Sequence, residues 1–246
     1  MDLRPQTESS LPAAMGVEEL PDPGGRFPYA NWGPGAAIAA LLIAFIAQFF
    51  FVIPVAVVEG GIESGDELSE AAEVTLQGLF VAALLIASYV VAARKGADLA
   101  QAASRLGLRR FRWSALLWML AAVGAYLFIA VLFTALIGEP EQEDIAEDFG
   151  PVGIQIVLVV LAAGFAEEVA FRGLLFGGLR TRMPGWAAAL VSAAIFGSLH
   201  AFTGISAVPV LIGFGFVLAL LYERTGSIVP GIILHMLNNA LALAAQ

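Results

Sequence analysis

VGIQIVLVVLAAGFAEEVAFRGLLFGGL, residues 152–179, is a long apolar run that contains three charged side chains. A helix that crosses a membrane needs about 20 mostly apolar residues, and this run exceeds that length. Glu167, Glu168 and Arg172 lie inside it, where an ionisable side chain costs several kcal/mol unless it is paired. The run therefore predicts a transmembrane helix that also carries a functional site.

The rest of the chain has the same apolar character. Of its 246 residues, 59% are hydrophobic and 13% are charged, whereas soluble domains are about 45–50% apolar and about 25% charged. This composition excludes a water-soluble globule, a disordered chain and a nucleic-acid binder with a basic face. Six further apolar stretches lie at 34–58, 74–93, 113–137, 186–202, 205–222 and 228–245. We therefore predict an all-α, polytopic bundle of about seven transmembrane helices.

Three regions are predicted along the chain. Residues 1–30 are polar, rich in proline and acidic residues, and are expected to form a flexible tail. Residues 31–93 are expected to form two N-terminal transmembrane helices, and residues 94–246 a helical core. The chain contains no cysteine, which excludes thiolate metal sites and cysteine nucleophiles. It also lacks the glycine-rich phosphate-binding motifs, so no nucleotide is expected.

The charged residues outside the spans indicate an orientation. The loops at 59–73 and 138–150 each hold six acidic residues and no base, whereas 94–112 holds six bases and one acid. Because lysine and arginine mark the cytoplasmic side of a membrane protein, we expect a multi-pass protein with a cytoplasmic N-terminus. The plasma membrane of a prokaryote is the expected location. The net charge of −9 then reflects orientation rather than an acidic binding surface.

The two glutamates of the 152–179 run have different predicted partners. Glu168 and Arg172 are four residues apart, so on a helix they share a face and can pair. Glu167 points about 100° away from Glu168. One carboxylate is thus predicted to be neutralised by arginine, while the other faces a different neighbour.

Two other spans carry the only two histidines of the chain, His200 and His235. Phe196 lies four residues before His200, and Asn239 lies four residues after His235, so each pair shares a helix face. Polar faces inside a membrane bundle turn toward one another or toward a water-filled cavity. We therefore predict that these faces converge with the glutamates.

Such a cluster can perform hydrolysis in two ways. A carboxylate and an imidazole can deprotonate a water molecule, while a histidine and an asparagine stabilise the oxyanion. Alternatively, Glu167, His200 and His235 match the three-ligand set of a catalytic zinc. A role in packing alone and a proton or solute path are the non-hydrolytic readings.

Three short motifs resemble those of a known family. EEVAFRG (167–173), FGSLH (196–200) and HMLNN (235–239) are similar to the EExxxR, FxxxH and HxxxN/D motifs of the CPBP family. These are intramembrane proteases related to the type II CAAX prenyl protease and to bacteriocin self-immunity proteins, also called Abi. The resemblance covers residues 94–246. The family core is sometimes drawn with eight spans, which is the alternative to seven.

The resemblance implies an all-helical intramembrane peptidase that acts on a membrane-anchored protein or peptide in the lipid bilayer. It implies that Glu167 and His200 activate the water and that His235 and Asn239 form the oxyanion site. Supporting roles fall to Glu168, Arg172 and Phe196. The family is labelled as metalloprotease, which implies zinc on Glu167, His200 and His235 if a metal is bound, with a metal-free glutamate mechanism as the rival. The alternative function is a non-enzymatic membrane partner or self-immunity protein.

Overall fold

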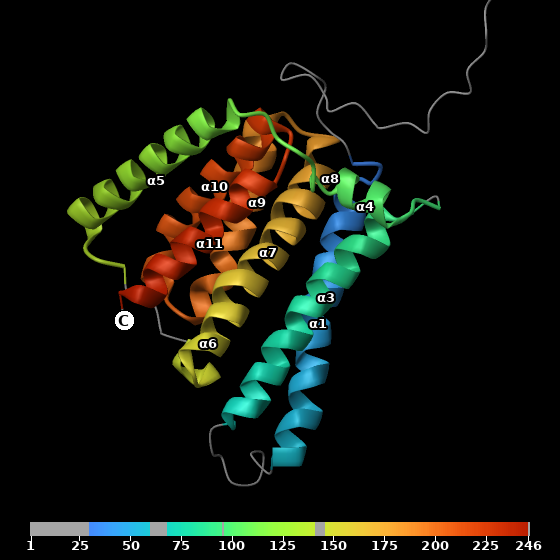
Figure 1. The fold of residues 1–246 in the computed structure, drawn as a ribbon, viewed down its shortest axis with the longest axis vertical. Coiled ribbons are helices and arrows are strands. Elements are labelled where there is room, and N and C mark those ends of the chain that lie inside the picture. The colour runs from blue at the N-terminus through green and yellow to red at the C-terminus, as the bar shows by residue number, and fades with distance from the viewer. Residues whose placement is uncertain (1–29, 60–67, 95, 141–145, 246) are drawn as a thin grey trace, which may run out of the picture.

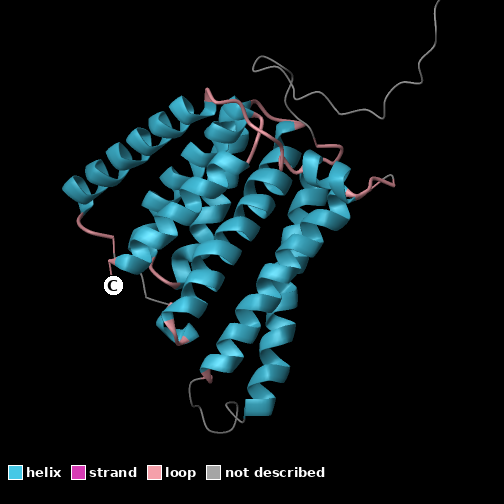
Figure 2. Cartoon of the chain, in the orientation of Figure 1, coloured by secondary structure: helices cyan, strands magenta, loops and turns pink. Residues whose placement is uncertain are grey.

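The computed structural model describes residues 30–59, 68–94, 96–140 and 146–245. All regular elements among these residues are helices, which run roughly side by side as a bundle (Figure 2). The predicted all-α class is therefore confirmed. The predicted flexible tail, residues 1–30, lies outside the described residues except for Ala30, as do parts of the two acidic loops.

Two long antiparallel helices form one side of the bundle (Figure 1). They are α1 (Pro34–Glu59) and α3 (Glu70–Ala92), and α3 also packs against the central helix. The side chain of Ser69 caps α3 by accepting a hydrogen bond from the backbone N–H of Ala72, which satisfies a donor that the helix leaves unpaired. The short α4 (Leu99–Arg105) and the peripheral α5 (Ala115–Ile137) follow.

One continuous helix runs through the middle of the bundle. The 3₁₀ turn η1 (Glu147–Phe149) precedes this helix. Its consecutive segments are α6 (Val152–Gln155), η2 (Ile156–Ala163), α7 (Gly164–Glu167), η3 (Glu168–Phe176) and α8 (Gly177–Arg180). The segments η2 and η3 are wound as π-helix rather than as the regular α-helix assumed from the sequence. All nine residues of η3 are buried. Because π-helical turns are rare and occur often at functional sites, this winding marks η3 as unusual.

The remaining helices close the bundle around this central helix. They are α9 (Gly185–Leu199), the 3₁₀ turns η4 (His200–Phe202) and η5 (Ile205–Ala207), α10 (Val208–Thr225) and α11 (Val229–Ala244). Glycine lets α9 and α10 approach closely, because a Cβ at Gly197 would lie 2.8 Å from the backbone nitrogen of Ile212. Small residues at such crossings are typical of helix packing in membranes.

Six helices are long and apolar enough to cross a membrane: α1, α3, α5, the α6–α8 helix, α9 with η4, and η5 with α10. The seventh predicted span corresponds to α11, which is apolar but shorter, with 16 residues. Large apolar side chains of α1 and α5 point outward, among them Phe49, Leu117 and Leu136 at 72%, 71% and 73% exposure. Such an apolar exterior suits lipid rather than water, so the chain is an integral, multi-pass membrane protein.

Candidate active site

The predicted pair of Glu168 and Arg172 is present at the centre of the bundle. Arg172 Nη1 lies 2.9 Å from Glu168 Oε1, and both side chains are about 1% exposed. The guanidinium carbon of Arg172 lies 4.5 Å from the ring centroid of Phe196, a cation–π distance. Two opposite charges are thus buried together, which avoids the much larger cost of burying either one alone.

His235 connects the two glutamates. Its Nδ1 lies 2.8 Å from Glu168 Oε1, and because an ionised carboxylate can only accept, Nδ1 is the donor. Its Nε2 lies 3.6 Å from Glu167 Oε2. The ring is 3% exposed and is enclosed by the aromatic rings of Phe196 and Phe214, with centroids at 5.9 Å and 5.3 Å.

The two neighbouring carboxylates differ in their surroundings, as the helix geometry predicted. Glu168 is held by an arginine and a histidine and is fully buried. Glu167 ends the α7 turn, its side chain is 20% exposed, and it contacts His235. Two carboxylates in unequal environments are a recurrent way to separate a reactive acid or base from a supporting one.

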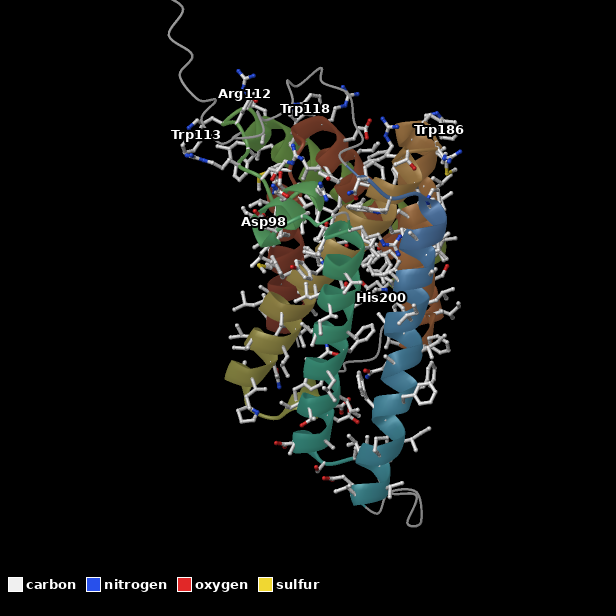
Figure 3. The ribbon with its side chains drawn as sticks, turned by 90° about the vertical axis from the view of Figure 1, so that its right-hand side faces the viewer. Asp98, Arg112, Trp113, Trp118, Trp186 and His200 are labelled. Atoms are coloured by element: carbon white, nitrogen blue, oxygen red, sulfur yellow. The ribbon has the colours of Figure 1, made fainter. Side chains whose placement is uncertain are left out.

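His200 lies at the point where α9 ends and η4 begins. Its Nδ1 lies 2.9 Å from the carbonyl oxygen of Phe196 and donates to it, because a carbonyl only accepts. In the neutral ring, Nε2 then carries the lone pair. The His200 ring is 4.9 Å from the Phe196 ring, which in turn contacts His235. Figure 3 shows His200 partway along the bundle, away from the end where Trp113 and Trp186 lie.

Asn239 lies one turn beyond His235 on α11. Its amide nitrogen donates to the carbonyl oxygen of Val159 in η2 at 3.0 Å, which uses one of its two N–H groups. The neighbouring Asn238 lines an apolar cavity of about 100 Å³ between α5, α10 and α11. Helix phase therefore separates the two asparagines, and Asn239 is the one that faces the helix carrying the glutamates.

The structure thus joins Glu167, Glu168, Arg172 and His235 by direct contact, and it joins His200 through the Phe196 ring. Sequence reasoning missed three contributors to this site, Ser192, Phe214 and Gly231. A Cβ at Gly231 would lie 3.1 Å from Glu168 Oε2, so glycine makes room for the carboxylate. A polar Ser192 inside an apolar run was the one available signal among these three.

The arrangement of the donor groups bears on the zinc alternative. Within the described ranges, no group of three or more His, Asp or Glu side chains is arranged to hold a metal ion. His235 presents Nδ1 to Glu168 and Nε2 to Glu167, while Nδ1 of His200 contacts the backbone carbonyl of Phe196. In this conformation Glu167, His200 and His235 do not form a zinc ligand set, so we derive no step through a metal.

Comparison with known proteins supports the motif-based family. Residues 150–241 match the family described as "Type II CAAX prenyl endopeptidase Rce1-like". The chain is 30% identical over 95 residues to "Putative membrane peptidase YdiL" of Bacillus subtilis strain 168, a match that spans 39% of this chain and 38% of that protein. No solved structure matches. All three motifs lie within the matched region, so the comparison and the motifs indicate a similarity to the same family of proteases.

Proposed function

We propose that this protein is an intramembrane endopeptidase that hydrolyses a peptide bond in a membrane-anchored protein or peptide. The observation that carries the proposal is the unequal pair of glutamates beside one histidine. Glu168 is neutralised by Arg172, whereas the accessible Glu167 lies 3.6 Å from His235 Nε2. The similarity of residues 150–241 to an endopeptidase family supports the same reaction.

In the first step, Glu167 and His200 activate a water molecule. The water is held between the Glu167 carboxylate and the His200 Nε2 lone pair, which the Nδ1 bond to Phe196 leaves available. Glu167 accepts a proton as the water oxygen bonds to the carbonyl carbon of the substrate. The carbonyl double bond becomes a single bond, and its electron pair moves to the oxygen to give a tetrahedral oxyanion.

In the second step, His235 and Asn239 stabilise the oxyanion, and the amide bond breaks. His235 Nδ1 is bonded to Glu168, so Nε2 is the ring nitrogen that donates to the oxyanion when it carries a proton. The second N–H of Asn239 is the other donor. Glu167 then returns its proton to the nitrogen. The electron pair of the oxyanion re-forms the carbonyl double bond as the C–N bond breaks and its electron pair stays on the nitrogen, which gives an amine and a carboxylic acid.

The substrate can be identified by comparing the termini of membrane proteins. We expect cells with the wild-type protein to contain specific new N-termini that are lost with the Glu167→Gln variant. Glu139→Gln makes the same chemical change at an exposed residue and should leave these termini in place. Identical termini in wild type and Glu167→Gln, at equal expression, would favour the non-enzymatic membrane partner or self-immunity protein.

We also propose that the N-terminus is cytoplasmic and that the membrane is the plasma membrane of a prokaryote. Arg112 gathers with three tryptophans, Trp113, Trp118 and Trp186, at one end of the bundle (Figure 3). Tryptophan belts mark membrane interfaces, and arginine marks the cytoplasmic one.

The cysteine-free chain allows a direct test of this orientation. With a membrane-impermeant maleimide on intact cells, Glu139→Cys should be labelled and Arg182→Cys should react only after lysis. Both residues are exposed, so accessibility at the protein surface is matched. The reverse labelling pattern would overturn the orientation.

A further inference from the structure

Two side chains from other parts of the chain donate hydrogen bonds to backbone carbonyls of η3. Ser192 Oγ on α9 donates to the carbonyl oxygen of Phe171 at 2.9 Å, and Trp32 Nε1 donates to that of Leu174 at 2.9 Å. Ser192 is 1% exposed and Trp32 is 4% exposed. Both bonds are therefore buried, where no water competes for the carbonyl.

Both bonds are accepted by carbonyls of η3, and the winding of η3 affects the geometry of the site. The segment η3 begins with Glu168 and contains Arg172. A π-helix pairs residues five apart instead of four, so the angle between successive side chains differs from that of an α-helix. Rewinding η3 to an α-helix would rotate the Leu174 end relative to the Glu168 end. The bonds to Phe171 and Leu174 are made together while η3 has its π winding.

Ser192 ties the helix of the glutamates to the helix of His200. Ser192, Phe196 and His200 lie at intervals of four residues on α9 and η4 and so share one face. The Ser192 hydroxyl binds the carbonyl of Phe171, whose ring contacts the Phe196 ring at 5.2 Å. The register between the two helices is thus fixed by a directional bond and by ring packing.

Trp32 lies in the segment that precedes α1 and contacts η3 near its Leu174 end. Its ring occupies a notch beside two glycines at the start of α8. A Cβ at Gly178 would lie 3.1 Å from Trp32 Nε1 and 2.9 Å from the Ala37 side chain, and a Cβ at Gly177 would lie 3.7 Å from the Trp32 ring. The indole therefore packs closely against this helix at the rotational position in which it donates to Leu174.

We propose that Ser192 and Trp32 are positioning residues that hold η3 in its π winding and thereby set how Glu168, Arg172 and His235 meet. The catalytic consequence rests on the proposed peptidase function. The structural consequence, a displaced contact between Glu168 and His235, does not rest on it. The two consequences can therefore be measured separately.

The structural consequence can be read from the two histidines of the chain. Protein with ¹⁵N-labelled histidine in detergent micelles should give one imidazole signal set with the Nδ1–H of His235 bound to Glu168. We expect Ser192→Ala and Trp32→Phe to shift this set. Ser88→Ala is the matched control, because Ser88 is also fully buried but donates to Leu84 within its own helix. It should leave the histidine signals unchanged.

The catalytic consequence is a loss of turnover without a loss of substrate affinity. We expect Ser192→Ala to lower kcat about tenfold at unchanged KM, the effect of one misplaced buried hydrogen bond on the transition state. Ser192→Thr, which keeps the hydroxyl, should recover most of kcat, and Ser88→Ala should retain it. Equal losses of melting temperature in Ser192→Ala and Ser88→Ala would separate this effect from general stability.

Each outcome has a defined meaning. Histidine signals and kcat in Ser192→Ala and Trp32→Phe that match those of Ser88→Ala would overturn the positioning role. Shifted histidine signals in a protein whose wild type cleaves no membrane-anchored peptide would uphold the positioning role and count against the peptidase function.

Discussion

Glu167→Gln is expected to lower kcat by about a thousandfold, within the range of 10²–10⁴ that a general base contributes. The amide keeps the size of the side chain but cannot accept the proton of the attacking water. The fold should persist, because Glu167 is partly exposed and is not the partner of Arg172. The measurement is the cleavage rate of a membrane-anchored peptide by purified protein in detergent, alongside its thermal unfolding.

Two further measurements make this result specific. Glu139→Gln, at an exposed residue, should cleave at the wild-type rate, and His200→Ala should be slow. Wild-type turnover in both Glu167→Gln and His200→Ala would show the assignment to be wrong. Elemental analysis of the active preparation should find well under one zinc per chain at full turnover, whereas turnover proportional to bound zinc would replace the metal-free mechanism.

Arg172→Met is expected to destabilise the protein by about 3–5 kcal/mol, because it leaves the buried Glu168 carboxylate without its cation. Both side chains are about 1% exposed, so water cannot take over the lost partner. The double variant Glu168→Gln/Arg172→Met should be more stable than Arg172→Met alone, since both charges are removed together. Unfolding in detergent micelles, followed by circular dichroism, measures these differences.

A second arginine–glutamate ion pair in the chain, Arg180 with Glu223, serves as a more exposed comparison for Glu168 with Arg172. Arg180 forms a two-bond ion pair with Glu223, at 2.8 Å and 2.7 Å, but the two side chains are 16% and 23% exposed. Arg180→Met should therefore cost only about 0–1 kcal/mol, as is usual for pairs that water reaches. Equal stability of Arg172→Met and Arg180→Met would contradict the view that the Glu168–Arg172 pair is fully desolvated.

Much of the architecture and of the site was predictable because it depends on local chemistry. Apolar runs of membrane-spanning length predicted the helices, although α11 is shorter than its predicted span. The interval of four residues predicted the pairing of Glu168 with Arg172, because side chains at that spacing meet on any helix of nearly regular winding. The same helix phase separated Glu167 from Glu168 and placed Asn239 on the face of His235.

By itself, then, the sequence determined the membrane-embedded helices, the polar residues that they carry and the contacts made within one turn. Only the tertiary structure decided that His235 bridges the two glutamates, that Phe196 lies between the histidines, and that η3 is wound as a π-helix. These features depend on the rotation and depth of one helix against another. That arrangement is set by packing and by bonds between distant residues, such as those of Ser192 and Trp32, which no local period of the sequence encodes.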